Sequence, residues 1–386
     1  MENRPSTIDH RPLRIALDVS QMVYHGHGVG RYTEELARAL LKLEQESVQF
    51  TYFAGALKQM GQFQLRRHKK PWSKATWRLV SLSPRLANWA FNYFNLPVEW
   101  YVGKQDLFHA SDWTQPRAKC PVVTTVHDLA FHHHPETVHK RVLRTQKRRL
   151  QRAVKNGSYF IADSESTKND LVKIYRLPKS QITVVYPGIG VEFEPQNNNK
   201  IKQVKIKYNL PDQYLLSLGT REPRKNLDRL IQAVQQLQQV EPATPPLVIA
   251  GRFGWGKENK VEGVQVTGFV DESDLPALYS GASAFVYPSL YEGFGFPVLE
   301  AMACGAPVVT SNLSSLPEVA GEAAVLVDPL SVNSIASGIN LALKNRKSLV
   351  TKGKKQAAKF SWEATAKQTL AVYTGILENR KTGGLN

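Results

Sequence analysis

The chain has 386 residues, 42% of them hydrophobic and 22% charged, which is typical of a globular protein of two or three domains and excludes a disordered chain. Lys and Arg number 50 against 33 Asp and Glu, and the resulting charge of +17 indicates an anionic partner: nucleic acid, an anionic membrane surface or a phosphorylated substrate. The two cysteines, Cys120 and Cys304, exclude a disulfide scaffold and a four-cysteine zinc site. Without a signal-peptide core or an apolar run of about 20 residues, we expect a cytoplasmic protein.

Short apolar, β-branched runs alternate with helical patterns along the whole chain. In the first half they predict helices at residues 29–46 and 138–155 and strands at 14–19, 48–54, 106–111, 122–128, 159–164 and 182–187. In the second half they predict helices at 226–240, 331–343 and 362–378 and strands at 214–220, 247–251, 264–270, 284–289, 307–312 and 323–328. This alternation predicts an α/β protein with two doubly wound, Rossmann-like domains of parallel sheets.

A polar, turn-rich segment, EPQNNNK at residues 194–200, divides the chain. We place a domain boundary there, so that the N-terminal domain is 1–195 and the next domain begins at 196. Residues 1–195 carry a net charge of +12 and residues 196–386 one of +5. Ligands of open α/β sheets bind outside the carboxyl ends of the strands, so two such domains that face each other would form a cleft.

The loop after the first strand reads DVSQMVYHGHGVGR and precedes an amphipathic helix. Its glycines, among them Gly28 and Gly30, would let the backbone approach a pyrophosphate at the start of that helix. Arg31 stands where a GxGxxG loop has its third glycine, so the spacing fits a tight βα turn equally well.

Two further loops place polar residues after predicted strands. His127 follows the apolar run VVTTV, where its imidazole could bind a substrate hydroxyl or phosphate, or be a structural histidine with satisfied hydrogen bonds. The segment GTREPRKNL contains Arg221, Arg224 and Lys225. Three cations at a strand end would suit a diphosphate leaving group, and the alternative is a solvated loop.

The block PSLYEGFGFPVLEAMACGAP carries the strongest signal in the chain. Glu292 lies on a glycine-rich loop, and Glu300 follows eight residues later on a helix that we expect to begin near Pro297. Gly293 and Gly295 would expose N–H groups beside that helix start, between the two carboxylates. One carboxylate could bind a sugar and the other a ribose diol, and the alternative is a pair of solvated glutamates.

This E-x7-E spacing resembles the signature of the retaining glycosyltransferases of family 4, which have the GT-B fold. The resemblance runs almost from end to end, through GHGVGRYT, TTVHDLAF, ADSESTKNDL, VVYPGI, GTREPRKNL, VTGFV, the E-x7-E block, SNLSSLPEVAGEAAVLVDP and FSWEATAKQTLAVY. The form GTREPRKNL looks most like bacterial mannosyl- or rhamnosyl-type transferases of surface polysaccharide assembly. The family also implies that residues 362–386 cross back to the N-terminal domain as a helix, which leaves 196–361 as the C-terminal domain.

The resemblance implies roles for individual residues. Glu292 would hold the donor sugar, His127 would touch it at the reacting centre, and Arg224 with Lys225 would neutralise the departing diphosphate. Donor-binding roles would fall to Gly28, Gly30, Arg221, Val270, Gly293, Phe294, Gly295, Phe296 and Glu300, the last of these at the ribose. In many members a single Arg follows the strand glycine, a position that is Thr220 here, so Arg221 departs from the pattern. Glu318 matches a recurrent family position whose role the sequence does not explain.

The implied reaction transfers a sugar from a nucleotide diphosphate donor with retention at the anomeric carbon. Arg224, Lys225 and helix N-termini would stabilise the charge on the phosphate oxygens, so we expect no metal and no other cofactor. Three consecutive histidines, 132–134, cannot all reach one ion from a regular helix or strand, and no DxD motif follows a strand. GDP-mannose is the first expected donor and a UDP-sugar the second, with a glycan or lipid-linked acceptor.

The acid-free stretch 66–98 interleaves seven basic residues with the aromatic residues Trp72, Trp77, Trp89, Phe91, Tyr93 and Phe94. This composition suits peripheral contact with the anionic inner face of a membrane, or single-stranded nucleic acid; the alternative is a solvated helix with a buried aromatic face. The chain has no nucleic-acid-binding motif, so we expect no nucleic-acid partner. The competing hypotheses are a nucleotide-sugar epimerase of GT-B fold and a basic nucleic-acid-binding protein.

Overall fold

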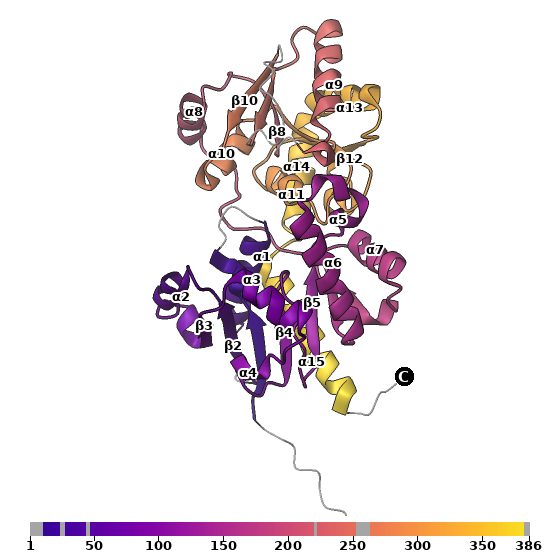
Figure 1. Ribbon diagram of the computed structural model, residues 1–386. Helices are drawn as coiled ribbons and strands as arrows, with labels where there is room; N and C mark the ends of the chain where they lie inside the picture. Colours follow the sequence, from indigo (N-terminus) through magenta and orange to yellow (C-terminus); the bar gives the residue numbers. More distant parts are fainter. Residues whose placement is uncertain (1–10, 24–27, 44–46, 220–221, 252–262, 382–386) are drawn as a thin grey trace, which may run out of the picture.

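The computed structural model describes residues 11–23, 28–43, 47–219, 222–251 and 263–381, and it consists of two α/β domains, drawn one above the other in Figure 1. Within each sheet the paired strands run parallel. Parallel strands need crossover connections, which helices supply here, and this confirms the predicted fold of two Rossmann-like domains.

Among the described residues the first sheet has seven strands in the order β3-β2-β1-β4-β5-β6-β7. The strands are β1 (Leu13–Asp18), β2 (Val48–Gly55), β3 (Thr76–Val80), β4 (Leu107–Ala110), β5 (Val122–Val126), β6 (Tyr159–Ala162) and β7 (Ile182–Val184). The helices are α1 (Gly28–Lys42), α2 (Met60–Arg66), α3 (Pro84–Ala87), α4 (Glu99–Val102), α5 (Ala130–His133), α6 (Lys140–Lys155) and α7 (Glu165–Tyr175). The strand order reverses between β1 and β4, which makes their carboxyl ends the switch point of this sheet.

The second sheet has six strands among the described residues, in the order β10-β9-β8-β11-β12-β13. The strands are β8 (Leu215–Leu218), β9 (Leu247–Ala250), β10 (Val264–Gly268), β11 (Ala284–Tyr287), β12 (Val308–Ser311) and β13 (Ala324–Val327). The helices are α8 (Asn198–Lys207), α9 (Leu227–Val240), α10 (Leu275–Ser280), α11 (Phe296–Ala303), α12 (Leu316–Ala320), α13 (Val332–Lys344) and α14 (Arg346–Ala357). Here the switch point lies between β8 and β11.

The last helix, α15 (Trp362–Lys381), returns to the first domain and packs against α1 (Figure 1). Its buried apolar side chains recur every three or four residues and join the core of the first domain; they are Trp362, Ala366, Leu370, Tyr373 and Ile376. This spacing places them on one face of the helix. The helix therefore links the two domains through a large apolar contact.

One interpretation of segment 66–98 was a single helix with a buried aromatic face, and the structure shows otherwise. It contains the edge strand β3, the short helix α3 and a π-helix at Asn88–Tyr93. Trp72 and Phe91 are buried in the core, whereas Trp89 and Phe94 are exposed. The aromatic residues therefore divide between the interior and the surface, and in the π-helix itself Trp89 and Phe91 lie on different faces.

Candidate active site in the cleft

The carboxyl ends of the two sheets face a shared cleft. A cavity of about 250 Å³ there is lined by His127 and Asp128, which follow β5, and by Glu222 and Arg224, which follow β8. Both sheets thus present the ends of their central strands to this space. Such ends are where open α/β sheets bind ligands, so the topology predicts a binding site between the domains.

Glu292, in the loop after β11, is the centre of a buried cluster of charges. Its Oε1 atom accepts hydrogen bonds from Lys225 Nζ at 2.8 Å, Tyr287 OH at 2.9 Å and Ser289 Oγ at 2.5 Å. Its Oε2 atom forms an ion pair with Arg224 at 2.8 Å. The cations follow β8, which is the strand beside β11. The switch point therefore brings together the two loops that the sequence singled out.

The two cations hold the Glu292 carboxyl ionised. Burial by itself would raise the pKa of Glu292, but Lys225 and Arg224 lower that pKa to about 2. Burial lowers the pKa of Lys225, against the opposing effect of Glu292. Burial also acts to lower the pKa of Arg224, but Glu292 and Glu222 raise it above its ordinary value. An anion in the cleft would compete with the two glutamates for these cations, so the cluster can exchange an internal ion pair for a bound phosphate.

At Gly293 the second domain lies directly against the first. A Cβ atom there would stand 1.9 Å from the carbonyl oxygen of His127 and 2.6 Å from the Cβ of Asp128. The Gly293 carbonyl oxygen accepts hydrogen bonds from Ser164 Oγ at 2.7 Å and Thr167 Oγ1 at 3.3 Å. Glycine is required here because the backbones approach too closely for any side chain.

The side chain of Glu300 is buried, with 4% of Glu300 exposed, and its carboxylate contacts side chains of both domains. It accepts a hydrogen bond from Tyr279 OH at 2.8 Å and pairs with Arg31 of α1 at 2.7 Å. Its helix, α11, begins at Phe296, one residue before the expected start. Gly295 precedes it with a φ of 110°, in the left-handed region that favours glycine. Glu300 is the carboxylate that we expected to bind the ribose. One of its two oxygens is therefore already paired with Arg31.

His127 is oriented by Asp163, which follows β6. The His127 Nδ1 atom lies 2.7 Å from Asp163 Oδ2, and the Tyr32 ring packs edge-on against the imidazole with 4.6 Å between centroids. Burial acts to lower the pKa of His127, but the Asp163 carboxylate opposes this and raises the pKa above its ordinary value. Because an ionised carboxylate can only accept, the contact favours a proton on Nδ1, and it sets the orientation of the ring beside the cleft.

The remaining predicted donor-binding residues occupy different environments. Gly28 and Gly30 lie in the first turn of α1, and a Cβ at Gly28 would meet nothing within 4 Å. The side chains of Phe294 and Val270 are buried in the core of the second domain. The side chains of those two residues are therefore not available to a ligand in the cleft. Arg221 lies outside the described residues.

Glu318, on α12, ties the two domains together. Its carboxylate accepts hydrogen bonds from the backbone N–H groups of Glu165 and Ser166, each at 2.8 Å, and from Tyr186 OH at 3.2 Å. These N–H groups belong to the first turn of α7, where the helix dipole favours a negative charge. Glu318 thus caps a helix of the other domain, a structural role for the position that the sequence left unexplained.

Four of the side chains that contact the predicted residues show what sequence reasoning missed. Tyr287 and Asp163 each stand at the end of a strand, a position that could have singled them out. Arg31 lies within the quoted loop motif, but nothing local indicates that it reaches Glu300. Tyr279 lies on α10 and carries no signal, since its contact with Glu300 exists only in the folded domain.

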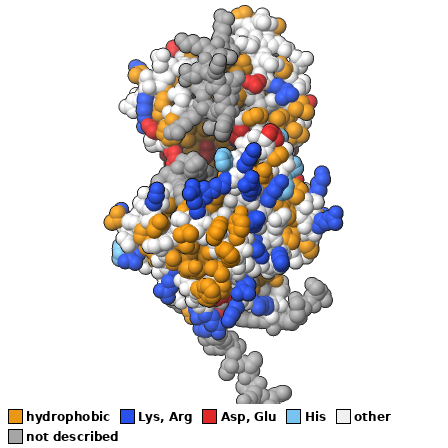
Figure 2. Space-filling model, viewed as in Figure 1, with side chains coloured by type: hydrophobic (Ala, Val, Ile, Leu, Met, Phe, Trp, Pro, Cys, Tyr) orange, Lys and Arg blue, Asp and Glu red, His pale blue; other side chains and the backbone are white. Residues whose placement is uncertain are grey.

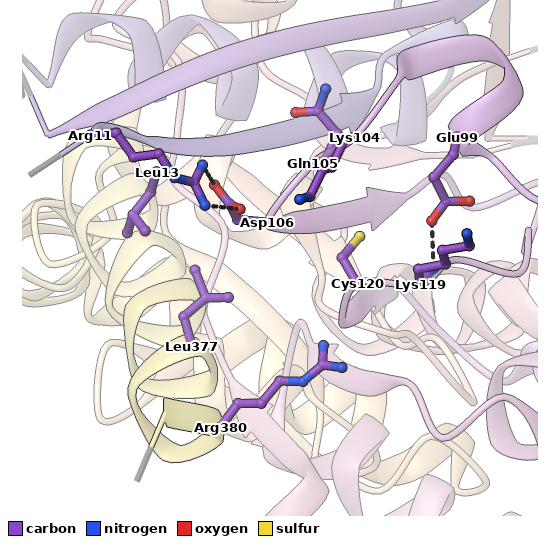
Figure 3. Close-up of a pocket in the computed structure, with 10 residues that line it drawn as sticks. All are labelled: Arg11, Leu13, Glu99, Lys104, Gln105, Asp106, Lys119, Cys120, Leu377 and Arg380. Carbon is purple, nitrogen blue, oxygen red and sulfur yellow. Dashed lines mark hydrogen bonds and ion pairs between the residues drawn. The ribbon is translucent and has the colours of Figure 1, made fainter. Parts of the chain in front are cut away.

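Two larger cavities lie in the first domain. One of about 680 Å³ adjoins the cleft at Asp112, which lines both spaces. The other, of about 670 Å³, lies at the opposite end of the sheet, where Asp106 pairs with Arg11 (Figure 3). The second contains no predicted site residue. Of these two cavities, the one beside the cleft shares Asp112 with the space that holds Arg224.

Within the part of the chain that the structure describes, no group of three His, Cys, Asp or Glu side chains is arranged to hold a metal ion, and no helix has the length and apolar character needed to cross a membrane. The adjacent histidines have separate partners. His132 Nε2 lies 2.8 Å from Tyr175 OH, and His133 Nε2 lies 2.9 Å from Asp170 Oδ2.

Two family models match the chain, Glycosyltransferase Family 4 over residues 26–193 and Glycosyl transferases group 1 over residues 198–360. O-antigen chain mannosyltransferase B of Escherichia coli is 31% identical, over 94% of this chain and 99% of its own length. Serotype-specific mannosyltransferase WbdA of Escherichia coli is 33% identical, over 57% of this chain and 29% of its own length.

Solved structures match the whole fold. WaaG, a glycosyltransferase involved in lipopolysaccharide biosynthesis, has a TM-score of 0.67 at 15% identity, over 94% of this chain and 100% of that one. Anabaena Alr3699/HepE in complex with UDP-glucose has a TM-score of 0.65 at 17% identity, over 94% and 99%. By its family matches and its near full-length relative, the chain belongs to the family 4 and group 1 glycosyltransferases, with the GT-B fold.

Proposed function

We propose that this protein is a retaining, metal-independent mannosyltransferase that transfers mannose from GDP-mannose to a glycan or lipid-linked acceptor in surface polysaccharide or glycolipid synthesis. The Glu292–Lys225–Arg224 cluster at the switch point carries the proposal, because it offers two cations to a leaving diphosphate. The choice of mannose rests on the near full-length similarity to an O-antigen chain mannosyltransferase. The donor would bind residues 196–361 and the acceptor residues 1–195.

The charge cluster would act when the bond between the anomeric carbon and the phosphate breaks. Lys225 and Arg224 would stabilise the negative charge that develops on the departing diphosphate, while Glu292 holds the sugar hydroxyls. The acceptor oxygen would attack on the face that the diphosphate leaves, and a phosphate oxygen would take the acceptor proton, which gives retention. His127 would contact the sugar. Glu300 would bind the ribose, so its ion pair with Arg31 would open or be shared.

A nucleotide panel tests the donor assignment. We expect GDP and GDP-mannose to raise the melting temperature more than UDP, ADP, dTDP and their sugars, since a ligand at ~100 times its Kd adds about 2.7 kcal/mol to stability. Lys225→Ala and Glu300→Ala should each abolish the shift. A larger shift with another nucleotide would identify a different donor. If no nucleotide shifts the melting temperature, the proposed transferase activity is contradicted. Donor turnover to a second nucleotide sugar without acceptor would indicate an epimerase.

We also propose peripheral contact with an anionic membrane through the exposed part of segment 66–98. Trp89 and Phe94 are 59% and 63% exposed, and Arg148 of the basic helix α6 stacks on Tyr93 at 3.5 Å. Figure 2 shows hydrophobic side chains gathered on one face of the first domain, with Lys and Arg side chains between them and the cleft. Aromatic side chains beside cations suit a lipid surface that carries negative headgroups.

Vesicle sedimentation tests the membrane contact. Phosphatidylglycerol vesicles should pellet the protein at low salt, and phosphatidylcholine vesicles should not. The double variant Trp89→Ser and Phe94→Ser should stay in the supernatant, while Ile206→Ser, at an even more exposed apolar position of the second domain, should pellet normally. Equal pelleting of the double variant and the wild type would contradict the proposal.

A further inference from the structure

We infer that Asp112 binds the acceptor and holds its reacting hydroxyl group where the 680 Å³ cavity meets the cleft, an inference that rests on the proposed glycosyl transfer. Asp112 follows β4 at the switch point of the first sheet. Among the described residues, four line both spaces: Val29, Asp112, Val142 and Gln146. Asp112 is the carboxylate of this set, so it can accept a hydrogen bond from a hydroxyl group on either side.

Buried partners hold the Asp112 carboxylate in place. Its Oδ1 atom pairs with Arg149 at 3.0 Å, and its Oδ2 atom accepts a hydrogen bond from Gln146 Nε2 at 3.1 Å. Arg149 is 1% exposed and is itself fixed by Thr124 Oγ1 at 2.9 Å and Gln146 Oε1 at 3.0 Å. A fully buried arginine is costly unless it is paired, and this one is aimed at Asp112. Arg149 and Gln146 are therefore positioning residues.

The Asp112 carboxylate keeps capacity for a ligand. An ionised carboxylate offers about four lone-pair sites, and the contacts to Arg149 and Gln146 use one on each oxygen. The neighbouring Asp18 is different, because it is buried and accepts hydrogen bonds from Ser20 and from Thr114 Oγ1 at 3.0 Å. Asp112 is thus the better placed of the two to bind a hydroxyl group.

The walls of the cavity suit a carbohydrate. Phe53, Phe91 and Trp113 supply apolar surface, and the carboxylate of Asp112 supplies acceptors. A sugar presents apolar C–H faces and hydroxyl edges, which match such a lining. The volume of about 680 Å³ lies within the range of small-molecule sites. The acceptor class is therefore a sugar that enters as the terminal residue of a glycan or glycolipid.

The test compares two aspartates at opposite ends of β4. Asp112→Asn should lower kcat/KM for octyl α-mannoside about 10- to 100-fold, since a hydrogen bond to a charged group is lost, and leave GDP binding unchanged. Asp106→Asn is the matched control, because Asp106 precedes the same strand and also pairs with arginine (Figure 3). Gln146→Leu keeps Arg149 paired with Asp112, and it should raise KM several-fold without changing GDP binding.

Direct binding separates this inference from the proposed function. Ligand-observed NMR should detect octyl α-mannoside on the wild type and on Asp106→Asn but not on Asp112→Asn. If the mannoside binds in this pattern but no transfer occurs, the result would support ligand binding by Asp112 and contradict the proposed transferase activity. Transfer by the wild type with kcat/KM of Asp112→Asn within about twofold would overturn the role of Asp112 and leave the transferase intact. Neither binding nor transfer by the wild type would overturn both.

Discussion

The Glu292→Gln variant should lose about 3 kcal/mol of stability and at least ~100-fold in transfer rate. The substitution leaves Lys225 and Arg224 close together in a buried site without the carboxylate that they share. Removal of one partner from a buried pair leaves an uncompensated charge, which is the costly case. Urea denaturation and the initial rate of mannose transfer measure the two effects. Glu222→Gln is the control, because Glu222 pairs with Arg224 at 3.2 Å through a more exposed side chain, and its loss should cost about 1 kcal/mol or less.

The stability difference between Glu292→Gln and the wild type should depend on pH. The folded pKa of about 2 lies below the ordinary value of 4.5, so the carboxylate stabilises the fold fully above about pH 4.5. This contribution falls as the pH drops through the folded pKa, because protonation removes the charge in both states. The gap measured by denaturation should therefore be constant from pH 7 to 5 and shrink toward pH 2. A gap that stays constant down to pH 3 would contradict the ion-pair assignment.

The Gly293→Ala variant should lose at least ~100-fold in kcat/KM while each domain stays folded. Its Cβ would stand 1.9 Å from the carbonyl oxygen of His127, so the domains must separate or the loop must move. Either change displaces Glu292 relative to His127 by about 1 Å, and a misplacement of that size can cost about 100-fold in rate. Transfer kinetics measure the loss, and small-angle scattering measures any separation of the domains.

Gly61→Ala is the control for this effect. Gly61 lies in α2, where a Cβ would meet nothing within 4 Å. Alanine is the better helix former, so the control should be at least as stable as the wild type and fully active. A Gly293→Ala enzyme with wild-type kcat/KM would mean that the contact between Gly293 and His127 is absent when the enzyme acts.

The strands of the two sheets could be predicted because parallel strands are buried on both faces. Runs such as VVTTV at β5 and AFVY at β11 are β-branched or apolar and are buried at every position, and this pattern is local. Strand β3 was missed, since it is a half-buried edge strand within an aromatic and basic segment. An edge strand needs apolar residues on one face at most. Its hydrophobic pattern is therefore hard to distinguish from that of a helix on the protein surface.

The loops of the site could also be predicted, but not the contacts between them. Glycines, cations and carboxylates after buried strands mark the ligand edge of an α/β sheet, and this singled out Glu292, Lys225 and His127. The pairing of Glu300 with Arg31 joins residues 269 positions apart, across the two domains. No local pattern encodes such a contact, because it depends on how the domains pack.

The sequence by itself determined the fold class, the family and the two loops that hold the charge cluster. The fold class follows from short-range hydrophobic periodicity, and the family and the loops follow from local motifs. The tertiary structure alone decided that Gly293 lies against His127, that Glu318 caps α7 and that Arg149 holds Asp112 at the edge of a cavity. These three features arise where segments distant in the chain meet. Their physical basis is the close packing and ion pairing of surfaces that exist only once both sheets have formed.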